Sequence, residues 1–570
     1  MTSSKASPVI DASKRDLSSL RSQDYDTIIV GGGISGAWLA LHCAQQGYRT
    51  ALIEKHDYAS QTSSSSSKLL HGGIRYLQQM QFAKVRESAL ERAHYLRAAP
   101  HLSNAVPFIV PTYRSFQKSK LFLNCGMLAY RFLCLGENKI IASKEQQLPP
   151  IRSISANELD QICDLSNEDH TGGVVFFERH MLDSERMVLA VLQTAKSIGA
   201  EVHNYVSAQN FMVQNDRVSG VHCRDELTGD EFELNSKLVI NSAGPWIDSL
   251  NSNLKNADRA PSVNGFAIGA HIITRQICDH AIAITTKHQS DAKIDRGGRH
   301  VFIIPWRGYS LIGTSYEDIN SPNEDLSIQA SHVDQLLDAV NEGMPSAQLS
   351  RDDLVSGYAG LYLLHTDNIK ATVYQGSGEY QIIDHAKANG IEGLVTSLGA
   401  KFTTGRKLSE LSMRLINDKL GCQTINTTAC KLKGSDYDSL SAFTLAKTEQ
   451  YSSKFSADQI KHLIAHYGSE LDDFIKSLDG RPELHEKICP HQHDIIGQVV
   501  WAISKEQAVN LNDMLFNRCS LGLLGIEKTQ VKKVAKLMAL HLNWSAEQQL
   551  EQENQVLTRL ADTKAALLDQ

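Results

Sequence analysis

The pattern of hydrophobic and polar residues near the N-terminus alternates between strands and a helix. An apolar, β-branched run over residues 27–30 predicts a buried strand, and a second short apolar run over 50–53 predicts another. Between them lies an apolar stretch of helical length that ends at Gly47. Glycines with the spacing G-x-G-x-x-G join the first strand to this helix; they are Gly31, Gly33 and Gly36. The order predicts a βαβ unit that closes on the acidic residue Glu54.

Each part of this unit has a use in binding a dinucleotide. Gly31 permits the tight turn, Gly33 lets the backbone approach a pyrophosphate, and Gly36 allows the helix to pack closely on the strand. The helix N-terminus presents free N–H groups to phosphates, and Glu54 is spaced to accept hydrogen bonds from a ribose. The alternative is a glycine-rich turn in an ordinary α/β unit. The presence of all the parts in order favours the dinucleotide site.

The periodicity changes along the rest of the chain. Residues 174–250 and 391–417 continue the pattern of helices and short buried strands. Residues 260–390 alternate short β runs with turns, which predicts a mostly antiparallel sheet. Beyond about residue 430 helical spacing dominates. We therefore expect an α/β fold, with a Rossmann-like dinucleotide-binding domain, an antiparallel-sheet substrate domain and an all-helical C-terminal domain.

Composition excludes several classes of protein. The 570 residues are 42% hydrophobic and 21% charged, and the net charge of −7 gives no reason to expect nucleic-acid binding. Ten cysteines are scattered without a C-x-x-C pair, so neither a disulfide framework nor a zinc site is indicated, and His491 and His493 beside Cys489 lack further ligands at suitable spacing. No apolar run is long enough to span a bilayer. Residues 1–23 are polar, and we expect a disordered leader.

A run of five serines, Ser63 to Ser67, follows the βαβ unit. By composition it resembles a linker. A linker is not expected directly after the ribose-binding acid, and the run continues into residues 68–76, where an imidazole, two glycines, a guanidinium and a phenol lie close together. We therefore interpret the serines as a segment that crowds a flat, polar ligand.

Two stretches, DTIIVGGGISGAWLA and TSSSSSKLLHGGIRYL, together identify a family resemblance. They are similar to the FAD-dependent glycerol-3-phosphate dehydrogenases, within the wider group of D-amino-acid-oxidase-like flavoproteins. Further matches follow in the family's order, from about residue 24 to about residue 525: NSAGPW (241–246), IGAHIIT (268–274), IPW (304–306), LIGTS (311–315), LSRDDLV (349–355) and LGAKFTTGRKL (398–408). The resemblance implies FAD rather than NAD, which the glycine pattern alone leaves open.

The resemblance also implies a set of site residues. The cofactor-binding positions are Gly31, Gly33, Ser35, Gly36, Glu54, Thr62, Ser63, Ser67, Lys68, His71, Gly72, Val206, Gly244, Gly399, Lys401 and Thr403. The substrate-binding positions are Arg75, Tyr76, Tyr362 and Lys401, and the catalytic pair is His271 and Arg351. His271 is expected to take the substrate's hydroxyl proton and Arg351 to polarise its oxygen. The alternatives are a structural strand histidine and an ordinary salt bridge of Arg351 with a neighbouring aspartate.

The implied reaction is FAD-dependent oxidation of glycerol 3-phosphate to dihydroxyacetone phosphate, with hydride transfer to flavin N5 and electrons passed to quinone. A helix beginning at Thr403, together with Lys401, is expected to stabilise the anionic reduced flavin. An alternative from another functional class is a flavin-binding protein that has lost turnover. The cationic residues Arg75, His271, Arg351 and Lys401 argue against it.

One departure from the family pattern changes the expected substrate pocket. The family's G-V-R-P-L reads G-L-Y-L-L over residues 360–364, so Tyr362 stands where the family has a pocket arginine. A charged hydrogen bond contributes about 1.5–3 kcal/mol, so its loss weakens the expectation of a phosphate. The alternative is a related flavin oxidoreductase that acts on a non-phosphorylated alcohol, hydroxy acid, amine or amino acid.

The expected location is cytoplasmic. Residues 118–139 are apolar and aromatic with basic ends, which is typical either of a segment lying on an anionic membrane or of a buried helix. The family resemblance favours peripheral contact with the cytoplasmic face of the inner membrane and the quinone pool as electron acceptor. It leaves a homodimer open.

The expected domain layout follows from these patterns. The leader covers residues 1–23, the FAD-dependent oxidoreductase region 24–430, and the helical domain 431–570. Within the oxidoreductase region, the FAD-binding segments are about 24–80, 174–250 and 391–417, and the substrate segments are about 81–173 and 251–390.

Overall fold

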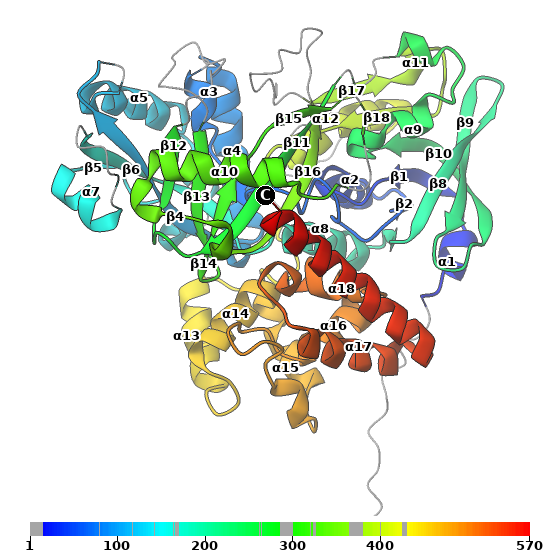
Figure 1. Cartoon of the computed structure of the whole chain (residues 1–570). Helices are drawn as coiled ribbons and strands as arrows, with labels where there is room; N and C mark the ends of the chain where they lie inside the picture. The colour runs from blue at the N-terminus through cyan, green and yellow to red at the C-terminus, as the bar shows by residue number, and fades with distance from the viewer. Residues whose placement is uncertain are drawn as a thin grey trace, which may run out of the picture.

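The computed structural model describes residues 15–569, apart from 79, 117, 142, 164, 166–169, 261–262, 264, 286–299, 320, 323–325, 364–379, 400 and 424–429. The side chains of residues 75, 78 and 285 are likewise outside the description. Two sheets lie side by side in the upper body of the molecule, and a helical domain lies beneath them (Figure 1).

The first sheet carries the predicted nucleotide-binding unit. Its central order is β17-β18-β10-β1-β2-β7, and the five strands from β18 to β7 run parallel. Its strands are β1 (Tyr25–Val30), β2 (Thr50–Ile53), β7 (Glu201–His203), β8 (Val206–Gln214), β9 (Arg217–Asp225), β10 (Glu231–Asn241), β17 (Gln381–Asp384) and β18 (Leu394–Leu398). The accompanying helices are α1 (Ser18–Arg21), α2 (Ile34–Gln45), α8 (Ser184–Ser197), α9 (Asp248–Asn251), α11 (His385–Ala388) and α12 (Gly405–Leu420).

The strands of this sheet are apolar because both faces are covered. Ile28 and Ile29 on β1 are both fully buried, and α2 packs against α8 and α12. The register pairs Val30 with Ile53 and with Asn241, so β1, β2 and β10 end at the same edge. Ligands of open α/β sheets bind outside the carboxyl ends of such strands.

Among the described strands, the second sheet is mostly antiparallel, as expected, and β12 and β4 form its parallel pair. Its strands are β3 (Leu69–Leu70), β4 (Ser103–Tyr113), β5 (Arg152–Ile154), β6 (His170–Met181), β11 (Phe266–Arg275), β12 (Ala281–Thr285), β13 (His300–Trp306), β14 (Tyr309–Gly313), β15 (Glu317–Ile319) and β16 (Leu354–Leu363). The helices of this part are α3 (Ile74–Gln78), α4 (Phe82–Ala98), α5 (Lys120–Leu133), α6 (Glu137–Ile140), α7 (Ala156–Ile162) and α10 (Ala330–Gly343).

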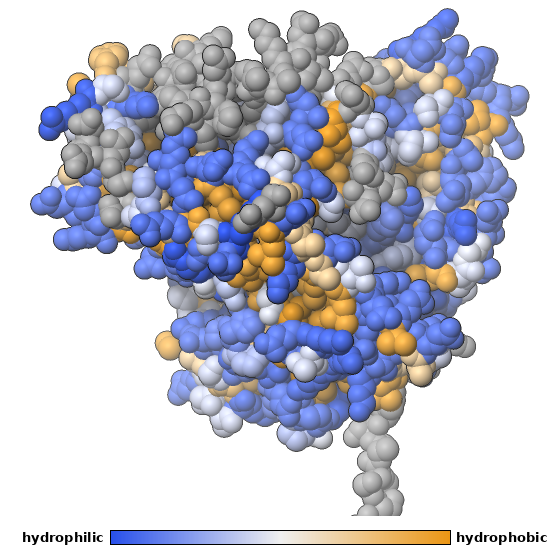
Figure 2. Space-filling model, viewed as in Figure 1, coloured by the Kyte–Doolittle hydropathy of each residue, from blue (hydrophilic) through white to orange (hydrophobic). Residues whose placement is uncertain are grey.

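The C-terminal part is helical, which confirms the third element of the predicted fold class. Its α-helices are α13 (Leu440–Gln450), α14 (Ala457–Tyr467), α15 (Leu471–Ser477), α16 (Gly497–Glu506), α17 (Lys528–Leu542) and α18 (Ala546–Leu568). Hydrophobic side chains gather in a band where this domain meets the two-sheet body (Figure 2). Leu567, at the end of α18, is buried in the core beneath β16. The boundary near residue 430 stays a prediction.

Residues 15–23 are ordered, contrary to the prediction. Leu20 on α1 is fully buried in the core beneath β1, and Arg15 Nη1 donates to Asp225 Oδ1 at 2.6 Å. The expectation of disorder through residue 23 is therefore wrong from residue 15 onward, because a few apolar residues in a polar stretch were enough to anchor it. Residues 1–14 lie outside the described part of the chain.

None of the described helices is both long enough and apolar enough to cross a bilayer.

Candidate active site

A cavity of about 560 Å³ lies at the carboxyl edge of the parallel sheet, where that sheet faces the antiparallel one. One end is lined by Glu54 and Val206, at the ends of strands in the first sheet. The other end is lined by His271 and Tyr362, on β11 and β16 of the second sheet. A single cavity thus joins the predicted ribose-binding acid to the predicted catalytic histidine.

The glycine turn forms one wall of the cavity. Gly31 has a φ of +110°, and a Cβ added there would lie 2.5 Å from the carbonyl oxygen of Ser242. At Gly36 an added Cβ would lie 1.9 Å from the carbonyl oxygen of Gly31, so close packing requires glycine. Gly33 has an ordinary extended backbone and only Ser63 Oγ, at 3.0 Å, near its added Cβ. Its open side faces the cavity, as a turn that receives a pyrophosphate requires.

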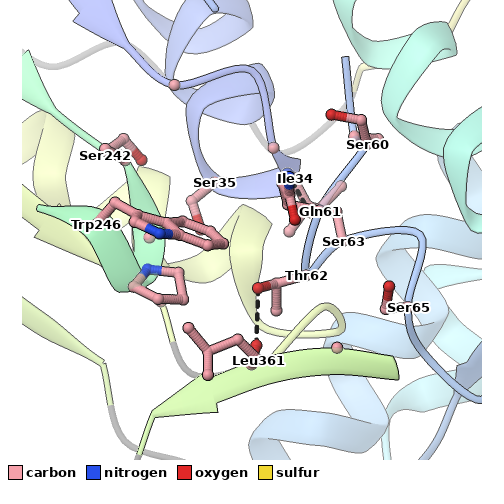
Figure 3. Close-up of a pocket in the computed structure, with 18 of the residues that line it drawn as sticks. Ile34, Ser35, Ser60, Gln61, Thr62, Ser63, Ser65, Ser242, Trp246 and Leu361 are labelled. Atoms are coloured by element: carbon pink, nitrogen blue, oxygen red, sulfur yellow. Dashed lines mark hydrogen bonds between the residues drawn. The ribbon is translucent and has the colours of Figure 1, made fainter. Parts of the chain in front are cut away.

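The serine-rich segment packs between this turn and β16 (Figure 3). The backbone N–H of Ile34 donates to Ser63 Oγ at 3.0 Å, and Thr62 Oγ1 donates to the carbonyl oxygen of Leu361 at 2.7 Å. An added Cβ at Gly360 would lie 2.3 Å from Ser65 Cβ. The segment is therefore a packed wall of the cavity and not a linker.

His271 is fixed in the second sheet by three neighbours. Its Nε2 lies 2.9 Å from Ser67 Oγ, and its ring stacks on Tyr358 with 5.0 Å between centroids. Tyr358 Oη donates to the carbonyl oxygen of Ser66 at 2.6 Å. Gly313 leaves the space for the imidazole, since an added Cβ there would lie 2.2 Å from His271 Cδ2. The ring is 3% exposed and lines the cavity, so its position is set before any ligand binds.

Lys401 brings a positive charge to the same cavity. Its Nζ is buried, makes no hydrogen bond to the described residues, and lies 3.9 Å from the centroid of the Tyr76 ring. Burial lowers the pKa of Lys401 to about 8, with Glu87 acting in the opposite direction. An unsolvated ammonium beside an aromatic face is placed to meet an anionic ligand.

Most of the predicted site residues line this cavity. They are Gly31, Gly33, Ser35, Glu54, Thr62, Ser63, Ser67, Val206, Gly244, His271, Tyr362, Gly399 and Lys401. Their individual roles toward cofactor and substrate stay predictions.

Several other predicted residues lie behind the cavity wall. Lys68 is fully buried and its Nζ pairs with Glu185 at 2.9 Å, while the Gly72 N–H donates to Glu178 at 2.8 Å. His71, Gly36, Thr403 and Tyr76 are also absent from the lining, although Tyr76 supports Lys401 from behind. For Lys68 and Gly72 direct cofactor contact does not fit these contacts, which instead order the segment that follows the serines. The role of His71 stays a prediction. The Arg75 side chain lies outside the described part of the chain.

Arg351 does not lie in the cavity, and the predicted catalytic role does not fit its contacts. Its Nη1 donates to the carbonyl oxygen of Leu567 at 2.6 Å, and its Nη2 pairs with Asp334. The guanidinium thus binds the last carbonyls of α18, where cations are favoured by the helix dipole. The expected salt bridge with a neighbouring aspartate is also not the observed one. Arg351 joins the C-terminal helix to the sheet.

Other lining residues were not predicted. Ser242, Trp246, His300, Phe302 and Thr314 contribute to the wall. Ser242 and Trp246 belong to the N-S-A-G-P-W motif, in which Gly244 is the predicted cofactor-binding position. His300 and Phe302 lie on β13, which is brought to the cavity by its pairing with β12 and β14, and the local sequence carries no signal for that.

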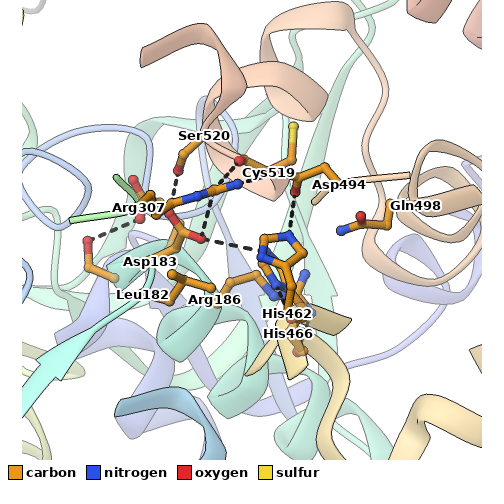
Figure 4. A network of polar contacts seen from close by, with 12 residues as sticks. Leu182, Asp183, Arg186, Arg307, His462, His466, Asp494, Gln498, Cys519 and Ser520 are labelled. Atoms are coloured by element: carbon orange, nitrogen blue, oxygen red, sulfur yellow. Dashed lines mark hydrogen bonds and ion pairs between the residues drawn. The ribbon is translucent and has the colours of Figure 1, made fainter. Parts of the chain in front are cut away.

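One group of described side chains could hold a metal by geometry: His462, His466 and Asp494, all buried at the domain junction (Figure 4). Asp494 is already engaged by Arg307 and by His462 Nε2, the latter at 2.9 Å. Asp183 lies 3.6 Å from His466 Nε2 on the other side. Because Arg307 supplies the positive charge that both aspartates need, we interpret the group as an ion network between the domains.

The cavity fits FAD on the chemistry of its lining. It offers a glycine-lined helix N-terminus for a pyrophosphate, an acid for a ribose, serine hydroxyls for a polar ring system, and the buried Lys401 ammonium at the far end. Each of these groups matches a different part of the dinucleotide.

Comparisons with known proteins agree with this interpretation. Residues 26–404 match the family model described as "FAD dependent oxidoreductase", and residues 425–549 match "C-terminal domain of alpha-glycerophosphate oxidase". A glycerol-3-phosphate dehydrogenase from a Synechocystis species is 30% identical over 548 residues, covering 94% of this chain and 96% of that protein. An aerobic glycerol-3-phosphate dehydrogenase from Staphylococcus aureus is 29% identical and covers 88% of this chain and 87% of its own.

Solved structures show the same fold. A glycerol-3-phosphate dehydrogenase from Bacillus halodurans, crystallised with FAD, superposes with a TM-score of 0.77 at 24% identity, covering 98% of this chain and 99% of that one. An L-α-glycerophosphate oxidase from Mycoplasma pneumoniae with FAD bound gives a TM-score of 0.52 at 16% identity and covers 69% of this chain and 95% of its own. The predicted fold class, cofactor and enzyme class are confirmed, and the chain belongs to the FAD-dependent oxidoreductase family, among the glycerol-3-phosphate dehydrogenases.

Proposed function

We propose that this enzyme oxidises glycerol 3-phosphate to dihydroxyacetone phosphate. The observation that carries the proposal is similarity to a glycerol-3-phosphate dehydrogenase over 94% of the chain, spanning both the cavity and the helical domain. When bound, FAD supplies the hydride acceptor for the substrate's carbinol carbon.

The other roles in the reaction are proposed for individual residues of the chain. His271 is the proposed base for the hydroxyl proton, and its Nε2 contact with Ser67 Oγ at 2.9 Å fixes the ring and offers a second hydroxyl to the proton path. Lys401 is proposed to hold negative charge at the reacting end of the cavity. The glycine turn and Glu54 are proposed to bind the pyrophosphate and ribose of FAD, and the sheet above the cavity to exclude water.

A second candidate is oxidation of an unphosphorylated alcohol, hydroxy acid, amine or amino acid. It is favoured by Tyr362, which lines the cavity from β16 where the family has a guanidinium. Of the four cationic side chains expected around the substrate, His271 and Lys401 line the cavity and Arg351 does not, while the Arg75 side chain lies outside the described part of the chain.

The two candidates are separated by turnover with an artificial electron acceptor. We expect reduction of a two-electron dye with glycerol 3-phosphate to exceed that with glycerol by at least about a hundredfold in kcat/KM, the ratio that about 3 kcal/mol of phosphate binding gives. Lactate, glycine and proline complete the panel. Equal rates with glycerol and glycerol 3-phosphate, or faster turnover of an unphosphorylated compound, would favour the second candidate.

Quinone is the proposed electron acceptor, and α5 is the proposed membrane contact. The outer face of α5 and its flanking turns expose large apolar side chains: Phe116 (81%), Leu121 (76%), Leu128 (69%), Phe132 (70%) and Leu135 (55%). The inner face buries Leu123, Met127 and Tyr130. An amphipathic helix whose exposed face is apolar, with basic residues at its ends, is typical of a segment that lies on an anionic lipid surface.

Sedimentation with vesicles containing phosphatidylglycerol tests this contact. We expect the wild-type protein to sediment with them and the double variant Leu128→Glu, Phe132→Glu to remain in the supernatant. Leu445→Glu is the matched control, because Leu445 is a similarly exposed leucine (73%) on α13 in the helical domain. Sedimentation of all three proteins alike would contradict the assignment of α5.

A further inference from the structure

The loop that follows β2 has two faces with different neighbours. Glu54, Lys55, His56 and Ala59 line the cavity at its ribose end. The side chains between them point the other way. Asp57 and Tyr58 are both 2% exposed, and their polar partners include residues of the helical C-terminal domain.

Asp57 is held by a two-pronged ion pair. Arg518 Nη1 donates to Asp57 Oδ2 at 2.6 Å, and Arg518 Nη2 donates to Asp57 Oδ1 at 2.9 Å. The Arg518 side chain is 1% exposed, and its Nη2 also donates to the carbonyl oxygen of Glu506 at 2.8 Å. The carboxylate accepts two further hydrogen bonds, from Asn517 and from Asn204. A buried fork of this kind fixes the orientation of both partners.

The next residue of the loop, Tyr58, also contacts the C-terminal domain. Tyr58 Oη donates to Gln507 Oε1 at 2.8 Å, and Gln507 Nε2 donates to the carbonyl oxygen of Val202 on β7 at 3.2 Å. Tyr205, between β7 and β8, donates from its Oη to Asp513 Oδ1 at 2.6 Å. The segment from Glu506 to Arg518 thus holds both the loop and the strand turn that together form the ribose end of the cavity.

The loop passes this constraint to the cavity through its backbone. The Ala59 N–H donates to the carbonyl oxygen of Gly32 at 3.2 Å, and the Tyr58 ring lies where an added Cβ on Gly32 would be only 3.0 Å away. Glu54 Oε2 accepts from the Gly32 N–H at 2.6 Å, and the Glu54 carbonyl accepts from the Val206 N–H at 2.8 Å. Any shift of Asp57 or Tyr58 therefore moves the glycine turn and the ribose acid as well.

We propose that the helical C-terminal domain supports the cofactor site from outside the cavity, with Arg518 as a positioning residue that holds the loop after β2 ready for the adenosine half of FAD. Arg518 touches no part of the cavity itself. The inference rests on FAD as the cofactor. Because linkage is reciprocal, FAD binding in turn stabilises the contact between the two domains.

The dissociation constant of FAD for the apoprotein tests the inference directly. Arg518→Lys keeps the charge but loses the fork, and we expect it to raise the dissociation constant at least about tenfold. Arg307→Lys is the matched control, because Arg307 is also a buried arginine that pairs across the domain junction, with Asp494. Its Nη1 donates to the carbonyl oxygen of Cys519 at 2.7 Å, so it holds the same C-terminal segment next to Arg518 without pairing with Asp57. We expect that control to change the dissociation constant less than about threefold. Tyr58→Phe removes one hydroxyl and keeps the packing, and we expect it to raise the dissociation constant by a smaller factor. It tests the inference if Arg518→Lys fails to fold.

The coupling between the partners separates positioning from general stability. We expect Asp57→Asn and Arg518→Lys to be non-additive, so that the double variant binds FAD no more weakly than the weaker single variant. Hydrogen exchange should show FAD protecting residues 506–518 in the wild-type protein and losing that effect in Arg518→Lys. An unchanged dissociation constant in both Arg518→Lys and Tyr58→Phe, or equal losses in Arg518→Lys and Arg307→Lys, would overturn this inference alone. Failure of the wild-type apoprotein to bind FAD would overturn the proposed function with it.

Discussion

Lys401 gives the sharpest prediction about how the site sets the redox chemistry. Its ammonium is buried at the cavity without a hydrogen-bonding partner among the described residues, and it rests on the Tyr76 ring at 3.9 Å. Reduction of FAD adds negative charge to the ligand, so a nearby cation favours the reduced form. Lys401→Met keeps the length and apolar stem of the side chain and removes only the charge.

The magnitude follows from the strength of a charged contact. A hydrogen bond to a charged group contributes about 1.5–3 kcal/mol. For a two-electron couple, about 1.4 kcal/mol corresponds to 30 mV. We therefore expect the midpoint potential of bound FAD to fall by about 30–65 mV in Lys401→Met. The assay is anaerobic titration against a reference dye at pH 7, where Lys401, with its pKa lowered to about 8, is still mostly protonated.

The surface offers a matched control. Lys407 lies on α12 and pairs with Glu410 at 2.7 Å, away from the cavity. We expect Lys407→Met to leave the potential unchanged. A potential for Lys401→Met within about 10 mV of the wild-type value, well under the 30 mV that about 1.4 kcal/mol gives, would refute the electrostatic role of Lys401.

The same residue makes the stability of the apoprotein depend on pH. Burial lowers the folded-state pKa of Lys401 from 10.5 to about 8, so between these values the unfolded chain holds a proton that the folded chain lacks. Stability from this group therefore rises as pH increases from about 8 to about 10.5. Lys401→Met should remove that rise, as measured by urea unfolding at several pH values.

Three further predictions follow from close contacts. Gly36→Ala should prevent folding, because its Cβ would lie 1.9 Å from a backbone oxygen, whereas Gly33→Ala should fold but purify without FAD. Circular dichroism of the purified proteins tests folding, and their flavin absorbance tests FAD binding. A yellow Gly33→Ala protein would contradict the pyrophosphate assignment. Gly313→Ala places a Cβ 2.2 Å from His271 Cδ2, so we expect retained FAD with substrate reduction slowed at least about tenfold; a normal rate by stopped-flow absorbance would argue against His271 as the base. Arg351→Met should lower the free energy of unfolding by about 1–2 kcal/mol through loss of the α18 contacts. The rate of flavin reduction by substrate should stay within about threefold of the wild-type rate, and a rate about a hundredfold slower would restore the catalytic role of Arg351.

The sequence predicted best what is local in the chain. The strand, the glycine turn, the helix, the second strand and Glu54 are contiguous, and their order predicts their arrangement because each step is determined by near neighbours. The serine run was assigned correctly to the cavity for the same reason, since it follows directly from that unit.

The errors concern contacts between distant parts of the chain. Arg351 was assigned to the substrate, but its partner carbonyl belongs to Leu567 at the far end of the sequence. Lys68 was assigned to the cofactor, but Glu185, on α8, neutralises it. The presence of a basic residue in a family motif does not show whether its charge pairs with a ligand or with a buried acidic side chain. Only the tertiary structure brings those partners into view.

The most direct test of the central claim is anaerobic mixing of the FAD-loaded protein with sn-glycerol 3-phosphate, followed by flavin absorbance and by assay of the product. We expect rapid bleaching and one dihydroxyacetone phosphate formed per FAD reduced. A flavin that stays oxidised with this substrate, yet is reduced by dithionite, would contradict glycerol 3-phosphate as the substrate while leaving the fold and the cofactor in place.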